Sequence, residues 1–191
     1  MDPDLPLIEA LQAGDDSALN ELINRHREAL HHFAFRYLRD EAAARDVAQE
    51  TFVRVYFKAD KFKPQSLTKT WIYSIALNLC RDHSRKYWKR RSDVSLDLPS
   101  TEQHPRLELA DPADEPSARA VKTDHVALLH AAIDQLPQKL KEALVLFTLD
   151  GKSQKETADI LGTSPKAVEL RVHQAKLKLR DILGGVIFLK N

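Results

Sequence analysis

The spacing of apolar residues is the feature that most restricts how this chain can fold. From residue 19 to residue 37, apolar or amphipathic side chains recur at steps of one, three or four positions, which places them along one side of an α-helix. They are Leu19, Leu22, Ile23, His26, Leu30, Phe33, Ala34 and Tyr37. Similar stretches follow along the chain, and only 5 Gly and 9 Pro are available to interrupt them. The sequence therefore predicts an all-α protein built from long helices.

Polar breaks divide the first half of the chain into three predicted helices. The first begins after the capping candidates Asp15, Asp16 and Ser17 and ends near residues 39–40. The second runs from Glu41 to about Lys58, and residues 59–66 form a loop around Pro64. The third has an apolar side made of Leu67, Trp71, Ile72, Ile75, Ala76 and Leu79.

Charge and composition predict two small domains. The net charge is only +1, but residues 81–91 are basic, residues 92–124 are acidic and residues 165–191 are basic. The stretch from Ser92 to about Pro116 is rich in Pro, Asp, Glu and Ser and has no apolar period, which is typical of a linker. We expect helical domains at residues 1–93 and 122–191, joined by a flexible acidic linker at residues 94–121.

Residues 153–178 predict a helix-turn-helix. Ser153 and Glu156 have the spacing of a capping box, Gly162 suits a left-handed helix end, and Ser164-Pro165 begins a second helix. Such a second helix fits the major groove of DNA. Its outward residues are Lys166, Glu169, Leu170, Arg171, His173, Gln174 and Lys176. A plain three-helix bundle with a solvated face is the alternative, but the coincidence of cap, turn and basic face favours DNA binding.

The sequence around this motif, LPQKLKEALVLFTLDGKSQKETADILGTSPKAVELRVHQAKLKL, resembles the −35 reading module of extracytoplasmic-function (ECF) sigma factors. Two earlier stretches resemble the same family. AARDVAQETFVRVY is similar to its polymerase-binding segment, and TKTWIYSIALNLCRDHSRK is similar to the segment that melts and reads the −10 element. The resemblance implies a sigma factor whose partners are core RNA polymerase, promoter DNA and, by family habit, an anti-sigma factor.

The resemblance assigns residues to two further surfaces. The polymerase-binding residues would be Asp46, Gln49, Glu50, Val53 and Arg54. The residues that bind and melt the −10 element would be Phe62, Lys63, Ser66, Asn78, Arg81, Asp82, Arg85 and Lys89. Spacing alone leaves alternatives open: the polar stripe from Asn78 to Lys89 is equally consistent with a solvated face, and Phe62 with a core residue.

The −35 residues divide by chemistry. The expected base-reading positions are Glu169, Leu170, His173 and Gln174. Glu can accept a hydrogen bond from cytosine, and Gln can bind adenine through two hydrogen bonds. Lys166, Arg171, Lys176 and Lys178 are better suited to phosphates, which position the protein without specifying a sequence.

Other classes of function find little support. The single Cys80, expected to be half-buried, cannot form an internal disulfide, and this favours a cytoplasmic location. The acidic start does not resemble a signal peptide, and no run of about 18 apolar residues predicts membrane insertion. His26, His31 and His32 fit no common metal-site spacing. We therefore expect no cofactor, no metal and no enzyme activity. Two alternatives remain: a dimeric helix-turn-helix repressor or activator, and a nuclease-like enzyme.

Overall fold

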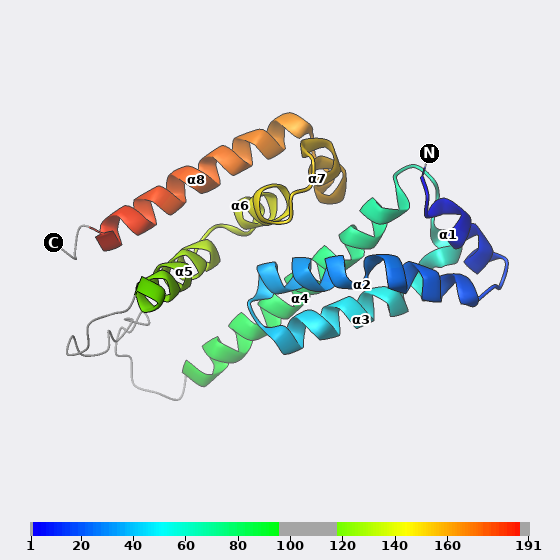
Figure 1. Ribbon diagram of the computed structural model, residues 1–191, viewed down its shortest axis with the longest axis horizontal. Helices are drawn as coiled ribbons and strands as arrows, with labels where there is room; N and C mark the ends of the chain where they lie inside the picture. Colours follow the sequence, from blue (N-terminus) through cyan, green and yellow to red (C-terminus); the bar gives the residue numbers. More distant parts are fainter. Residues whose placement is uncertain (1, 96–117, 188–191) are drawn as a thin grey trace.

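The protein is described by a computed structural model that covers residues 2–95 and 118–187. Every regular element within these ranges is helical, which confirms the all-α prediction (Figure 1). In chain order the elements are α1 (Leu5–Gln12), α2 (Ser17–Leu38), α3 (Glu41–Lys58), the 3₁₀ turn η1 (Ala59–Lys61), α4 (Thr68–Ser95), α5 (Ala118–Asp134), α6 (Gln138–Ala143), the π-helical segment η2 (Leu144–Leu149), α7 (Gln154–Leu161) and α8 (Pro165–Ile187).

Helices α2, α3 and α4 pack into the core of the N-terminal half. The predicted stripe of α2 faces inward, where Leu22, Leu30 and Phe33 are fully buried, whereas Leu19 and Ile23 lie at its edge. The helices also begin where the sequence predicts, and local hydrogen bonds stabilise their first turns. Asp15 accepts hydrogen bonds from the amide and hydroxyl of Ser17, and Asp40 accepts one from the Ala43 amide at 3.0 Å. These caps satisfy free amides at the starts of α2 and α3.

Helix α1 was not predicted from the sequence. It buries Ile8 and Leu11 against the core, and Asp4 at its N-cap is almost fully buried. The Asp4 carboxylate lies 2.9 Å from His26 Nε2 and 3.2 Å from Arg25 Nη1. His26 is therefore a packed residue with an acidic partner, and the pair explains a histidine on an apolar stripe. The partners of Asp4 lie more than 20 positions away in the sequence, so local periodicity could not reveal the contact.

The C-terminal half follows the predicted helix-turn-helix closely. Ser153 and Glu156 form the capping box in both directions, and Gly162 ends α7 with a φ of 61°. The Oγ atom of Ser164 accepts from the Ala167 amide at 3.2 Å and caps α8. The sequence missed the π-helical widening at η2, which leads to a hydrogen bond from the Asp150 amide to the Val145 carbonyl.

Two details differ from expectation. Cys80 was expected to be half-buried, but it is fully buried, and this burial raises the pKa of its thiol. Helix α4 continues to Ser95 and α5 begins at Ala118, so both helices extend into the segment predicted as linker. The rest of that segment lies outside the described residues, and the domain boundaries stay a prediction.

The two halves of the chain share part of one core. Val145 and Leu146 of η2 and Ile160 of α7 are buried in the cluster that contains Phe33 and Tyr73. Helix α7 accordingly packs on α4, and η2 packs on α2 (Figure 1). This arrangement could not be predicted from the sequence, because each half has its own complete pattern of apolar residues.

We expect that Asp4→Ala lowers the free energy of unfolding by about 1–3 kcal/mol, because it leaves buried His26 without its partner. Urea unfolding measures the change. The matched control is Glu21→Ala, which removes an exposed carboxylate from the same Arg25 and should cost less than about 0.5 kcal/mol. Equal losses in the two variants would show that the buried pair contributes nothing beyond a surface ion pair.

Candidate nucleic-acid and partner-protein interfaces

The outward face of α8 is available to a ligand. On its inner face, Val168 and Val172 pack against the small side chains Ala143 and Ala158, which allows close approach to α6 and α7. Gln154 Nε2 donates to the Pro165 carbonyl at 2.8 Å and fixes the start of α8 relative to α7. The predicted residues that are exposed are Lys166, Glu169, Leu170, His173, Gln174 and Lys176, while Arg171 is half-buried. Apart from Leu170 this face is polar, and Lys166 lies 2.9 Å from Glu169 on it.

The polar stripe of α4 is partly occupied. Asn78 is exposed and accepts a hydrogen bond from Arg81 Nη1 at 2.9 Å, and Asp82 pairs with Arg85 at 2.9 Å. Arg81 Nε and Nη2 donate to the two carboxylate oxygens of Glu142 on α6, both at 2.7 Å. These hydrogen bonds raise the pKa of Arg81 above its ordinary value. Lys89 belongs to α4, but its side chain lies outside the described part of the structure.

The loop before α4 divides into exposed and buried residues. Lys63 and Ser66 are exposed, in keeping with a nucleic-acid contact. Phe62 is buried, and the centroid of its ring lies 4.8 Å from that of Trp71. It therefore packs as a core residue in this structure, as the alternative interpretation allowed, and does not offer a ring to a base.

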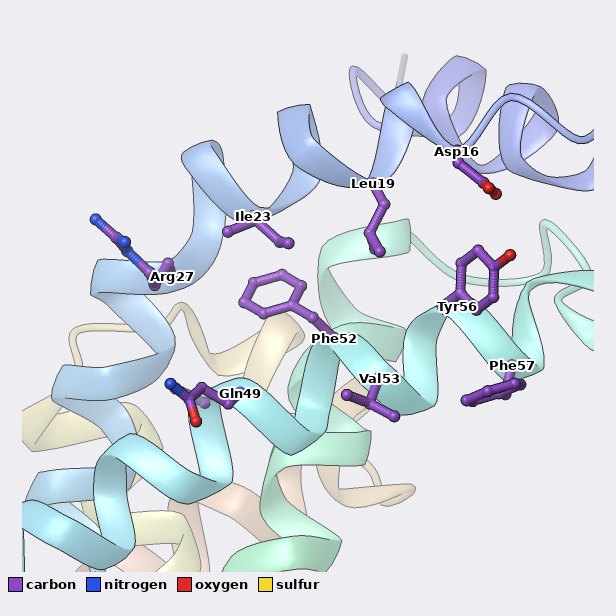
Figure 2. A pocket seen from close by; sticks show the side chains of 10 residues that line it. Asp16, Leu19, Ile23, Arg27, Gln49, Phe52, Val53, Tyr56 and Phe57 are labelled. Carbon is purple, nitrogen blue, oxygen red and sulfur yellow. The ribbon is translucent and has the colours of Figure 1, made fainter.

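Helix α3 presents a polar face beside an apolar groove. Asp46, Gln49, Glu50 and Val53 are exposed, and Arg54 is half-buried and pairs with Glu50 at 2.9 Å. The groove between α2 and α3 has a volume of about 560 Å³ (Figure 2). Its lining comprises Asp16, Leu19, Ile23, Arg27, Ala48, Gln49, Phe52, Val53, Tyr56 and Phe57.

Sequence reasoning missed the aromatic end of this groove. Tyr56 and Phe57 are 41% and 74% exposed, an unusual state for large apolar side chains. The signal was present, since Phe57 follows Val53 by four positions and both lie off the buried stripe. The Tyr56 hydroxyl donates to Asp16, and this hydrogen bond raises the pKa of Tyr56. Asp16 and Arg27 stand eleven positions apart on the α2 side, roughly 16 Å along a helix.

Comparison with known proteins identifies the family. Residues 22–90 match the family model of Sigma-70 region 2, and residues 127–179 match that of Sigma-70, region 4. The RNA polymerase sigma factor CnrH of Cupriavidus metallidurans is 34% identical over 188 residues, which cover 96% of each chain. The ECF RNA polymerase sigma factor SigE of Mycolicibacterium smegmatis is 31% identical over 176 residues, 90% of this chain and 65% of that one. The chain belongs to the ECF sigma factors.

Solved structures agree with this assignment. CnrH in complex with the cytosolic domain of CnrY superposes with a TM-score of 0.65 at 27% identity, covering 95% of this chain and 97% of that one. The sigma factor RpoE of Bartonella quintana, solved with the anti-sigma factor NepR, shares the fold with a TM-score of 0.59 at 22% identity, covering 86% and 96%. A dimeric repressor or activator is therefore not favoured, and sigma factors are regulators of transcription initiation rather than enzymes.

Within residues 2–95 and 118–187 no group of three or more His, Cys, Asp or Glu side chains is placed to hold a metal ion. In the same ranges, no helix of this ECF sigma factor has the length and apolar content needed to cross a membrane.

A contact between the two halves of this ECF sigma factor depends on the protonation of His130. Arg39, which ends α2 in the left-handed conformation, places Nη1 2.6 Å from His130 Nε2 on α5. Arginine can only donate, so His130 must be the acceptor and hence neutral. Burial, followed by the charge of Arg39, lowers the pKa of His130, and Asp134 opposes this shift in part.

We expect the contact between the halves to weaken as the pH falls from about 8 to about 5.5. Protonation of His130 is disfavoured in the contact, so the contact has its full stability above the ordinary His pKa of about 6.5 and loses stability below it. Energy transfer between dyes on cysteines introduced at the exposed Glu28 and Asp159 measures the change, because buried Cys80 does not react. His130→Gln should remove the pH dependence; an unaltered pH profile in that variant would contradict the assignment.

Proposed function

We propose that this ECF sigma factor binds core RNA polymerase through α3, holds the opened −10 strand along α4 and reads the −35 element with α8, acting in the cytoplasm. The observation that carries the proposal is the free outward face of α8 on a fully capped helix-turn-helix. A solvated face is common on surface helices, but here it lies on the second helix of a capped helix-turn-helix within the segment that matches Sigma-70, region 4, a geometry that suits the major groove.

The −35 contact divides between reading and positioning. Gln174 and Glu169 are exposed on the face of α8 that would enter the major groove, where their amide and carboxylate match adenine and cytosine edges. Leu170, 55% exposed, suits the methyl group of thymine. Lys166 and Lys176 carry exposed positive charges and suit the phosphates.

The −10 contact uses binding energy and requires no chemical step. Unpairing a few base pairs costs free energy, which contacts to the extruded bases and the strand phosphates can offset. Asn78, Arg81 and Arg85 on α4, together with Lys63 and Ser66 in the loop, supply polar groups on one side of the N-terminal half. We assign Phe62 a supporting role, because its ring holds the loop against Trp71.

The groove beside α3 suits an amphipathic helix of the polymerase. It is apolar along Leu19, Ile23 and Phe52 and carries Asp16 and Arg27 as charged groups (Figure 2). An apolar helix face fits such a groove, and the charges would fix its direction. We also propose that an anti-sigma factor regulates this protein, because the structures of similar sigma factors were solved with such partners.

The test is transcription in vitro with purified core polymerase and genomic fragments. New transcripts that require this protein would support the proposal and define its promoters. Val53→Glu places a charge in the groove and should reduce these transcripts at least tenfold, the equivalent of about 1.4 kcal/mol of polymerase binding. The matched control is Val126→Glu, a similarly exposed valine on α5 outside the groove. Transcripts that survive Val53→Glu undiminished would exclude the groove as the polymerase site, and DNA binding without stimulation would favour a conventional regulator.

Two substitutions on α8 should separate reading from positioning. Lys176→Ala should weaken binding similarly at all promoters, because a phosphate contact is independent of sequence. Gln174→Ala should change which promoters are used, by about 1–3 kcal/mol at one base pair. A panel of single-base promoter variants, read by transcription with core polymerase, distinguishes the two. If both variants shifted the panel in the same way, the division would be wrong.

A further inference from the structure

Two acidic side chains of the C-terminal half are buried against cations of the N-terminal half. Glu142 on α6 is 3% exposed and binds Arg81 of α4 through both carboxylate oxygens at 2.7 Å. Asp150, after η2, is 4% exposed and lies 2.6 Å from Arg36 of α2 and 2.8 Å from Lys152. We name these four residues, Arg36, Arg81, Glu142 and Asp150, the interdomain latch.

Further contacts across the same boundary support the latch. Lys141 lies over the ring of Tyr37 at 4.8 Å, and Lys152 lies over the ring of Tyr73 at 4.2 Å. Val145 and Leu146 of η2 are completely buried in the apolar core of the N-terminal half. The closed arrangement therefore combines apolar burial with specific charge pairing, and the charges fix which surfaces meet.

The latch occupies a group that the opened strand would need. A guanidinium binds carboxylate and phosphate through the same pair of parallel hydrogen bonds. In the closed chain Glu142 takes both of these bonds from Arg81, and the remaining Nη1 donates to Asn78. The outward residues of α8, by contrast, are exposed. Closure therefore occupies Arg81 of the −10 surface and leaves the side chains of the −35 surface exposed to solvent.

In the closed arrangement, one chain also cannot bind both elements of a promoter at the same time. Arg81 and Gln174 line a single cleft of about 670 Å³. Promoter elements centred 25 base pairs apart are separated by roughly 85 Å of duplex, at about 3.4 Å per base pair. A chain bound to both elements must therefore part the two halves and release Arg81 from Glu142.

We propose that the interdomain latch is an autoinhibitory contact, in which Glu142 takes the place of a strand phosphate on Arg81 and keeps the free sigma factor from binding −10 DNA. The inference rests on the proposed role of α4. Opening separates the pairs and returns their charges to water, which recovers the hydration that burial had removed. Removing one partner alone is different, because the closed form loses an ion pair across the boundary and keeps the cost of burying the acidic group or its neighbours. Without Arg36, buried Asp150 keeps only Lys152 of its own half, and without the Glu142 carboxylate, Arg81 loses both of its carboxylate hydrogen bonds.

Arg36→Gln provides the sharpest test. Arg36 lies on α2, away from the residues assigned to DNA, and its loss removes a positive charge. Simple electrostatics predicts weaker DNA binding, whereas release of the latch predicts tighter binding. Glu142→Gln removes the carboxylate that holds Arg81. Glu21→Gln is the control for Glu142→Gln, because it removes one negative charge in the same way but from the exposed pair with Arg25. Circular dichroism verifies that each variant is folded, and if Glu142→Gln unfolds, the half-exposed Arg36 carries the test.

Two readouts are combined on the full chain. The dye pair at positions 28 and 159 reports closure. Fluorescence anisotropy reports binding to a single-stranded −10 oligonucleotide and to a −35 duplex, both taken from a promoter mapped by transcription. If the open form is about a tenth of the wild-type population, full opening tightens −10 binding by up to about tenfold. We expect Arg36→Gln and Glu142→Gln to lower energy transfer and tighten −10 binding, with unchanged −35 affinity and no effect of Glu21→Gln.

Three results would overturn the proposal or its basis. Unchanged energy transfer in both latch variants would show that the ion pairs do not hold the halves together. Reduced energy transfer without tighter −10 binding would show that the contact is not inhibitory. Finally, Arg81→Gln introduced into the Arg36→Gln chain should abolish the gain. If −10 binding were retained there, the role of α4 in the proposed function would fail, while the dye pair would still report the latch.

Discussion

The buried side of α2 is the constraint on which the rest of the structure depends. This helix contacts α1, α3, α4 and η2, so four elements from distant parts of the chain are positioned by one surface. Leu22, Leu30 and Phe33 are completely buried along it, and each contributes about 1.5–3 kcal/mol relative to an exposed side chain. Because α3 and α4 take their places from α2, the groove between α2 and α3 and the polar stripe of α4 are both positioned by the same apolar contacts.

What the sequence could predict follows the range of the interactions. The capping box of Ser153 and Glu156, the turn at Gly162 and the break at Asp40 depend on neighbours within a few positions, and all were found in the structure. Helix α1 is held by Asp2, Asp4 and Gln12, whose partners lie 21 to 66 positions away, and it was missed. In the latch, Arg81 and Glu142 are 61 positions apart in the sequence, and Arg36 and Asp150 are 114 positions apart. A periodic pattern of apolar residues cannot predict such contacts.

The candidate sites show the same division. Outward residues of α8 and α3 could be assigned by helical spacing, since one buried face determines the other. Phe62 could not, because its burial depends on Trp71 and on the path of a loop. Tyr56 and Phe57 were missed for another reason. The helical period of α3 places them outside the core, but they form a groove only together with Leu19 and Ile23 of α2, which the sequence does not place beside them.

The choice of arginine at position 81 allows one residue to serve two states. A lysine ammonium is a compact point charge, whereas the planar guanidinium can hold a carboxylate or a phosphate through two parallel hydrogen bonds. Glu142 supplies such an oxyanion within the chain, and a strand phosphate supplies one from outside. Exchange between them keeps the number of charge-assisted hydrogen bonds on Arg81 constant, so the balance between closed and bound states depends on what else opening changes: the Arg36–Asp150 pair, the hydration of Glu142, and the apolar contacts of Val145 and Leu146.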